Sequence, residues 1–363
     1  MKQLLNILNT VPEFARLAAD LESGRSPVEV AGLSPVHRAH FAAGLLERLD
    51  CPVALVCADE GECARLCADV TALTGVSAVM VGAREFLFHD GAVASRQWEH
   101  QRLAAFHAMA QGRARLIAAT VEGLLQRTLP PGALAAHVVE VDAAGSYDPD
   151  QLADRLAALG YTRCQQVEGV GQFALRGGIL DVFSPGMDDP VRIEFWDRDV
   201  DSMGSFDVSS QRRAGRLERA VFLPVSELLP VRDENGNWVR LGDRQLPARY
   251  DTLATAAHHL PPEAVVCLSE SSRVAERGKN WLWQLNEDVK TLLENGALDG
   301  RHAVFAAGMD ELMAVLSDHA LCFLDSFTTS AAPLPPRDIL TAQGRPLSSF
   351  GASLDAAAAD LTQ

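Results

Sequence analysis

The sequence predicts an α/β protein in which a parallel-sheet domain is interrupted by an α+β domain with a mainly antiparallel sheet. Residues 1–132 alternate helical and strand patterns, as parallel strands joined by helices do. Residues 133–223 contain several short strands separated by tight turns, which is typical of an antiparallel sheet. The alternation of helices and strands returns over residues 224–340, so we expect this segment to complete the α/β domain.

Each element of the first domain has a local signal. Ser34 and Pro35 are expected to start a helix, because apolar residues follow them at helical spacing. Residues 52–58 form a continuous apolar run, the pattern of a strand that is buried on both faces. Asp59 and Glu62 then stand where they would cap the next helix. Further helices are expected to begin near residues 12, 95 and 120, and further strands to cover 28–31, 77–81 and 116–119.

The rest of the chain follows the same two patterns. In the interrupting domain we expect a first strand over 137–141, a helix over 149–159, and strands over 173–175, 179–183, 191–195, 201–206 and 217–223. Beyond it we expect strands over 265–268 and 321–324 and helices over 274–293 and 310–317. Residues 331–363 are rich in Pro, Ala and Ser, and we interpret 341–363 as a linker toward further domains.

The charge balance argues against binding of duplex DNA through its phosphates. The 363-residue chain has a formal net charge of −16, and its only lysines are Lys2, Lys279 and Lys290. Neutralisation of a DNA backbone requires a basic surface. The sequence predicts one local basic patch, formed by the arginines at 212, 213, 216 and 219.

Cysteine usage and hydropathy indicate a cytoplasmic protein. The seven cysteines include no CxxC pair, so we interpret them as buried thiols in a reducing compartment and predict no metal site. No apolar run reaches the roughly 18 residues of a membrane span, and we therefore expect no membrane partner.

The position of a phosphate-binding loop can be tested directly, because such a loop follows the first strand of this kind of sheet. A working loop needs glycines, a lysine on the phosphates and a Ser or Thr on magnesium. Gly32 and Ser34 are present, but no lysine lies between Lys2 and Lys279, so there is no GK[ST] motif. We therefore predict that this chain binds no nucleotide cofactor.

Other catalytic constellations are also missing from the sequence. The strand over 321–324 is followed by a single acid, Asp325, and not by the Asp-Glu pair that would hold magnesium. There is no GxSxG motif, and no cysteine has an identifiable histidine partner. We accordingly predict no catalytic residues and no enzyme activity for this chain by itself.

Two strand patterns instead place polar and aromatic side chains on one face of the antiparallel sheet. Period-two alternation separates Arg176 from the apolar residues of its strand. In the next strand, Arg192, Glu194 and Trp196 share the side opposite to the apolar residues. A surface Trp beside arginines supplies the large apolar area and planar donors of a binding hot spot. The alternative is that Trp196 packs at the edge of the sheet.

Three segments of this domain, 171–183, 191–196 and 206–212, are similar to the domain shared by two bacterial repair proteins, UvrB and the transcription-repair coupling factor. The flanks favour the coupling factor family. UvrB has an intact GKT loop and a tyrosine-rich DNA hairpin in its first domain, whereas the only tyrosines here are Tyr147, Tyr161 and Tyr250. The stretches that resemble the coupling factor are 32–41, 84–86, 98–103, 323–327 and 348–354.

This resemblance implies that the α/β domain has a degenerate P-loop helicase-like fold and that the chain is the N-terminal UvrB-like module of a coupling factor. Family members recruit UvrA to RNA polymerase stalled at a lesion, for nucleotide excision repair. RNA polymerase and DNA are engaged by C-terminal domains that this chain does not include, and the motor among them, an ATP-dependent DNA translocase, uses ATP and magnesium. The alternative is a UvrB-like damaged-DNA-binding ATPase or helicase domain.

The resemblance also carries a UvrA-binding role to particular positions. These are Arg176, Arg192 and the aromatic residue at 196, and Glu194 shares their face. Most family members have Phe where this chain has Trp196, so we expect the contact to be kept with an altered fit. In the family this surface is masked by the C-terminal domain until activation. We expect the isolated chain to be a monomer.

Overall fold

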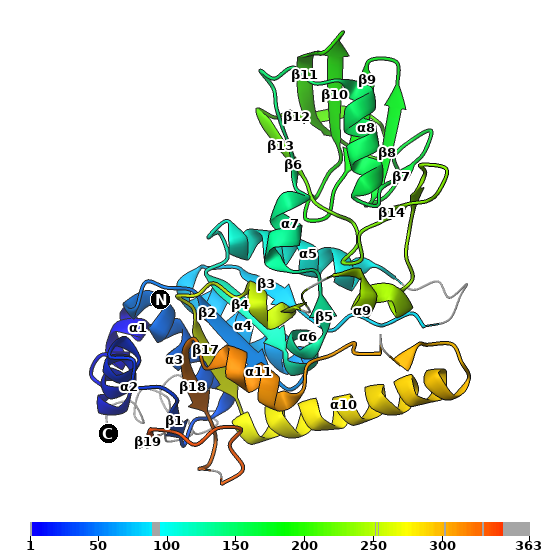
Figure 1. Ribbon diagram of the computed structural model, residues 1–363. Helices are drawn as coiled ribbons and strands as arrows, with labels where there is room; N and C mark the ends of the chain where they lie inside the picture. The colour runs from blue at the N-terminus through cyan, green and yellow to red at the C-terminus, as the bar shows by residue number, and fades with distance from the viewer. Residues whose placement is uncertain are drawn as a thin grey trace.

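The structure consists of an α/β domain from which a smaller α+β domain projects (Figure 1). The computed structural model describes residues 2–88, 95–250, 252, 254–300, 303–328 and 330–343. The chain leaves the α/β domain after α7 (Pro131–Ala136) and returns to it through the segment that follows Phe222. The predicted fold class, a parallel-sheet domain interrupted by a mainly antiparallel one, is therefore confirmed.

A seven-stranded sheet forms the centre of the α/β domain, in the order β19-β1-β18-β17-β2-β4-β3, and neighbouring strands pair in parallel. The predicted doubly buried strand is β2 (Val53–Cys57), and every one of its residues is buried. The other strands are β1 (Val28–Ala31), β3 (Ala78–Val81), β4 (Leu116–Thr120), β17 (Val265–Ser269), β18 (Ala320–Leu324) and β19 (Asp338–Thr341).

Helices cover both faces of this sheet because successive residues of each strand point to opposite sides. Val53, Leu55 and Cys57 pack with one group of helices, and Ala54 and Val56 pack with the other. The first group is α1 (Lys2–Leu8), α2 (Pro12–Glu22), α3 (Pro35–Arg48) and α4 (Glu60–Thr74). The second group includes α5 (Gln97–Ala110), α6 (Val121–Leu125), α10 (Ser271–Glu294) and α11 (Met309–Leu316).

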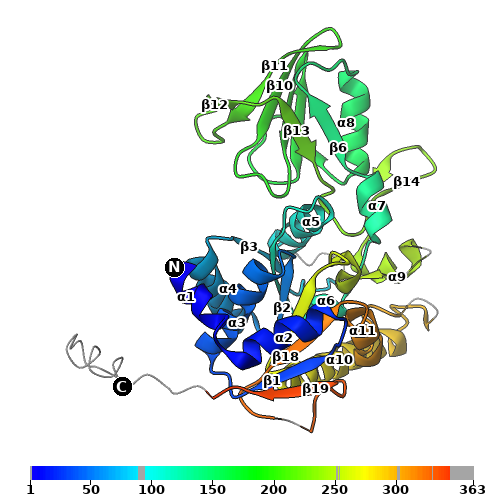
Figure 2. The ribbon, with the colours of Figure 1, turned by 90° about the vertical axis from the view of Figure 1, so that its left-hand side faces the viewer.

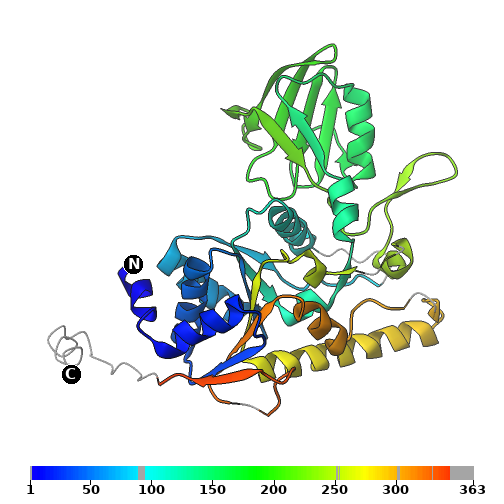
Figure 3. The same cartoon turned by 60° about the vertical axis from the view of Figure 1, so that its left-hand side comes forward.

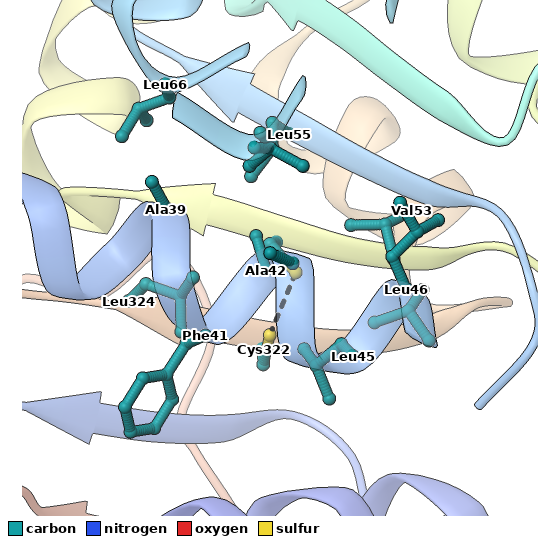
Figure 4. Close-up of a cluster of buried hydrophobic side chains, with 14 of the residues drawn as sticks. Ala39, Phe41, Ala42, Leu45, Leu46, Val53, Leu55, Leu66, Cys322 and Leu324 are labelled. Atoms are coloured by element: carbon teal, nitrogen blue, oxygen red, sulfur yellow. Dashed lines mark hydrogen bonds between the residues drawn. The ribbon is translucent and has the colours of Figure 1, made fainter. Parts of the chain in front are cut away.

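Figure 4 shows part of the first of these two cores, where α3 packs alongside the strands. Small residues on α3, such as Ala39 and Ala42, let the helix approach the sheet closely. The thiols of Cys267 and Cys322 lie 3.3 Å apart on adjacent strands and are buried. The clustered cysteines of the sequence, Cys57, Cys63 and Cys67, are buried in the same core.

The end of the described chain contains a strand that was not predicted from the sequence. Asp338–Thr341 form β19, which pairs in parallel with β1 and adds the last strand of the α/β domain. This edge strand has only two strongly apolar residues, Ile339 and Leu340, so its existence depends on the backbone of β1 and not on a hydrophobic pattern. From residue 344 onward the predicted linker, including the stretch 348–354, lies outside the described residues.

The α+β domain is built on a six-stranded sheet in the order β12-β11-β10-β9-β8-β7. Its pairs are antiparallel, except that β7 runs parallel to β8. The helix α8 (Pro149–Ala158) and the ribbon of β6 (Val139–Asp142) and β13 (Arg219–Phe222) cover one face (Figure 2). The sheet strands are β7 (Thr162–Arg163), β8 (Gln172–Arg176), β9 (Ile179–Phe183), β10 (Val191–Trp196), β11 (Asp199–Phe206) and β12 (Arg213–Arg216).

Strand β12 was not predicted from the sequence. Its sequence, Arg-Ala-Gly-Arg, shows no alternation of apolar and polar residues. The strand lies at the edge of the sheet. Its position follows from the backbone of β11, and Gly204 on β11 allows the two strands to approach, since a Cβ there would collide with the carbonyl oxygen of Gly215.

A buried ion-pair cluster joins the returning segment to α5. The guanidinium of Arg102 donates to the Glu227 carboxylate over 2.6 Å, and both side chains are fully buried. Arg102 also donates to the carbonyl oxygens of Gly82 and Gly123. Glu99 accepts hydrogen bonds from the side chain of Ser226 and the backbone N–H of Glu227.

The arginines around Glu227 keep it charged. Burial raises the pKa of the Glu227 carboxyl, but Arg102 and Arg84 outweigh it and hold the pKa below its usual value. The buried ion pair between Arg102 and Glu227 therefore fixes the segment that returns from the α+β domain on α5, because neither charge is stable in the interior without the other.

We predict that Arg102→Met lowers the free energy of unfolding by about 3–5 kcal/mol, because it leaves the Glu227 carboxylate buried without its main partner. Urea-induced unfolding measures this. The control is Arg216→Met, which removes a pair with Glu218 whose two side chains are about 80% exposed, and it should change stability by no more than about 0.5 kcal/mol. Equal effects of the two variants would contradict the prediction.

Candidate functional site

The face predicted from the sequence is the side of the antiparallel sheet opposite to α8. A two-residue turn at Gly177 and Gly178 joins β8 to β9, and Gly177 has φ +59°, which suits glycine. The turn sets the register that places Arg176 opposite Ile179. In the same register Asp181 on β9 lies beside Arg192 on β10, so the two strands bring an acid and an arginine together.

Asp181 was not singled out from the sequence, and it lies at the centre of this face. Its carboxylate is buried and accepts from Arg192 Nε over 2.7 Å and Arg192 Nη2 over 2.8 Å, one oxygen each. It also accepts from Arg176 Nη2 over 2.8 Å. Two arginines thus share one buried carboxylate. The sequence signal was present, an acid inside an apolar strand, but only the register identifies its partners.

Arg192 is held on several sides and is not freely displayed. Its guanidinium lies over the Phe206 ring, 4.5 Å from the centroid, and donates to the Gln211 side-chain oxygen over 3.2 Å. The hydrogen bonds to Asp181 raise the pKa of Arg192 above its usual value. With 20% of its side chain exposed, Arg192 presents only part of the guanidinium to solvent.

Arg176 and Trp196 are the exposed members of the face. The Arg176 side chain is 48% exposed and lines an open hollow of about 800 Å³ together with Arg163 and Gln172. Trp196 is 81% exposed at the end of the hairpin between β10 and β11, where Asp197 has φ +58°. An indole this exposed does not pack at the sheet edge, so that alternative is wrong.

Glu194 is engaged by neighbours on the same face. Its carboxylate accepts from the Ser202 hydroxyl over 2.7 Å and lies 3.4 Å from the guanidinium of Arg213. The predicted basic patch is therefore partly neutralised. Arg216 pairs with Glu218, and Arg219 pairs with Glu140 on the separate ribbon. The structure brings Arg176 and Arg192 together at Asp181, and Glu194 and Trp196 follow Arg192 along the same side of β10. These five residues are referred to below as the docking face.

The phosphate-loop position at the carboxyl end of β1 is occupied by the protein's own groups. The backbone N–H groups of Gly32 and Leu33 donate to the carbonyl oxygens of Ser326 and Asp325 over 3.2 and 3.0 Å. Gly32 has φ +88°, and a Cβ there would collide with the carbonyl oxygen of Ala342. Amides that would face a phosphate in a nucleotide loop are thus used inside the fold.

Charged side chains fill the same edge of the sheet. Arg38 on α3 donates to Glu270, which follows β17, over 2.5 Å, and it lies 3.6 Å from Glu62. Asp325 accepts from the backbone N–H and the hydroxyl of Ser271 over 2.6 and 2.7 Å. Burial raises the pKa of Asp325 to about 6. The acid that follows β18 is therefore buried at the start of α10.

Neither a metal centre nor a membrane segment is found in the described part of the chain. Among those residues, no group of three or more His, Cys, Asp or Glu side chains is arranged to hold a metal ion. The helices described there also include none that is long and apolar enough to cross a membrane.

The comparisons with known proteins first define the class of the projecting domain. Residues 139–228 match the family model described as the UvrB interaction domain. This range contains α8, the six-stranded sheet and the docking face, and it ends within the segment held on α5.

The whole chain is similar to transcription-repair-coupling factors, as the resemblance predicted. It is 24% identical to that of Bacillus subtilis (strain 168), over 99% of this chain and 34% of the relative. It is 33% identical to that of Myxococcus xanthus over 60% of this chain and 19% of the relative, and 27% identical to that of Escherichia coli (strain K12) over the same shares. The chain thus spans about a third or less of these relatives.

We predict that Trp196→Ala leaves the free energy of unfolding within about 0.5 kcal/mol of the wild type, because the indole is exposed. Ile193→Ala on the same strand should cost about 2–5 kcal/mol, since Ile193 is fully buried. Urea-induced unfolding of both variants tests this. A loss of more than about 1.5 kcal/mol in Trp196→Ala would mean that the indole supports the fold.

Proposed function

We propose that this chain is the UvrB-like module of a transcription-repair coupling factor and that it recruits UvrA through the docking face. The observation that carries the proposal is that the UvrB interaction domain match covers the domain whose sheet presents Arg176 and Trp196. An exposed Trp next to arginines is the composition of protein-binding hot spots. The module belongs to nucleotide excision repair at lesion-stalled RNA polymerase.

The proposal includes no catalysis by this chain. At the strand ends, the amides of Gly32 and Leu33 and the side chains of Arg38 and Glu270 bond within the protein. Opening that site for a nucleotide would break these bonds, and no lysine is near in sequence to replace them. This observation disfavours the alternative, a UvrB-like damaged-DNA-binding ATPase or helicase.

The remaining activities belong, in this proposal, to the longer protein. Contacts with RNA polymerase and DNA, and the ATP- and magnesium-dependent translocase that displaces the polymerase, lie in domains beyond the part spanned here. The formal net charge of −16 supports a module that docks on a protein and does not itself hold DNA. We further propose that the module is cytoplasmic and monomeric.

Trp196→Ala is expected to weaken UvrA binding at least tenfold, because it removes the exposed aromatic area of the docking face. Trp283→Ala is the matched control, since Trp283 is 65% exposed but lies on α10 of the α/β domain. Calorimetric titration of UvrA with each variant measures the dissociation constants. Equal affinities of the two variants would place the UvrA contact elsewhere.

We expect millimolar magnesium and ATP to leave the unfolding temperature of the chain unchanged within about 2 °C, because the proposal is that no nucleotide binds. A bound nucleotide would stabilise the native state and raise this temperature. No ATP hydrolysis should accompany mixing. Purified UvrB serves as the positive control in both assays. A nucleotide-dependent rise in the unfolding temperature would revive the ATPase alternative.

A further inference from the structure

Asp181 places a buried charge in the middle of the antiparallel sheet. The register of β8, β9 and β10 is set by backbone pairing, by the Gly177-Gly178 turn and by buried apolar residues on the opposite side. A buried ion pair contributes little net stability compared with apolar residues of the same volume, because both charges lose their hydration. The consequence of Asp181 must therefore be sought in what it does to the arginines.

The geometry of Arg192 shows that effect. The two oxygens of Asp181 engage Nε and Nη2 along one edge of the guanidinium, a bidentate arrangement that fixes its plane. Phe206 supports that plane from one side. Gln211, which has φ +57° in the loop between β11 and β12, accepts from the same guanidinium. Asp181 thus orients Arg192, and Arg192 in turn contacts the loop.

Arg176 is arranged differently by the same carboxylate. Asp181 engages one nitrogen, Nη2, while about half of the Arg176 side chain stays exposed toward the open hollow. An arginine free in solvent samples many rotamers, and ordering it on binding costs affinity. A carboxylate that already holds one edge removes part of that cost and leaves other donors for a partner.

We propose that Asp181 is a positioning residue of the docking face, which orients Arg176 and Arg192 for contact with UvrA. This inference rests on the proposed function. It assigns Asp181 no contact with UvrA, because the carboxylate is buried beneath the two arginines. Its effect on binding must therefore disappear when the arginines are absent.

The first test measures orientation without UvrA. In nuclear magnetic resonance spectra, the Nε–H proton of Arg192 should exchange slowly with solvent in the wild type, because it donates to Asp181. Asp181→Asn keeps the side-chain shape and removes the charge, and it should speed this exchange at least tenfold while the backbone amides of β9 and β10 stay protected. Unchanged exchange of the Arg192 Nε–H would overturn the proposal.

The second test is a mutant cycle of UvrA binding. Asp181→Asn should weaken binding about tenfold in the wild-type background, and less than twofold when Arg176→Ala and Arg192→Ala are already present. Equal weakening in both backgrounds, or none in the wild type, would overturn the inference. If the wild type binds UvrA and Trp196→Ala weakens it while Asp181→Asn does not, only this inference fails. If the wild type does not bind UvrA, the proposed function fails with it.

Arg192→Lys provides a route that leaves Asp181 paired, should Asp181→Asn unfold the domain. Lysine keeps the positive charge beside the carboxylate but can neither bind it in a bidentate manner nor stack on Phe206. We expect this variant to weaken UvrA binding about tenfold while its unfolding midpoint stays near that of the wild type. Wild-type affinity in Arg192→Lys would show that charge alone suffices, and would overturn the positioning role.

Discussion

The pairing of Arg102 with Glu227 is the interaction on which the arrangement of the two domains depends. Neither charge could remain buried alone, because the loss of hydration would cost several kcal/mol. Arg102 lies on α5 and Glu227 lies on the segment that returns from the projecting domain, so satisfying both requires this segment to lie along α5. Glu99 strengthens the same contact by accepting the backbone N–H of Glu227. The projecting domain is thereby anchored to the body of the protein (Figure 3).

The need to pair buried charges also shapes the docking face and the carboxyl ends of the parallel strands, but with opposite results. Beneath the docking face, the buried carboxylate of Asp181 gathers two arginines at a surface that remains open. At the ends of the parallel strands, Arg38 and Glu270 pair inside a region that the backbone also closes. The parallel-sheet domain thus uses the polar groups at its strand ends for contacts within the protein. The docking face lies on the inserted domain, whose strands β9, β10 and β11 lie at the end far from the α/β body (Figure 1).

Much of the fold could be predicted because its signals are local. The apolar run of β2, the Asp59 cap of α4 and the Thr120 cap of α6 each arise within a few residues of sequence. The strands β12 and β19 were missed because they are edge strands. An edge strand can be held by the backbone of one neighbour and needs no apolar alternation of its own. The side of the sheet on which Arg176 and Trp196 lie was predictable from period two alone.

The sequence by itself therefore determined the fold class, the resemblance to coupling factors and the side of the sheet on which Arg176, Arg192, Glu194 and Trp196 lie. Only the tertiary structure decided how those residues act together. It showed that Arg176 and Arg192 both donate to Asp181. It also showed that Arg192 is mostly buried, whereas Trp196 is exposed to solvent. It also showed that the amides of Gly32 and Leu33 are already bonded within the protein. The physical reason is that strand register and domain closure join groups distant in sequence, and burial sets the energies of their charges.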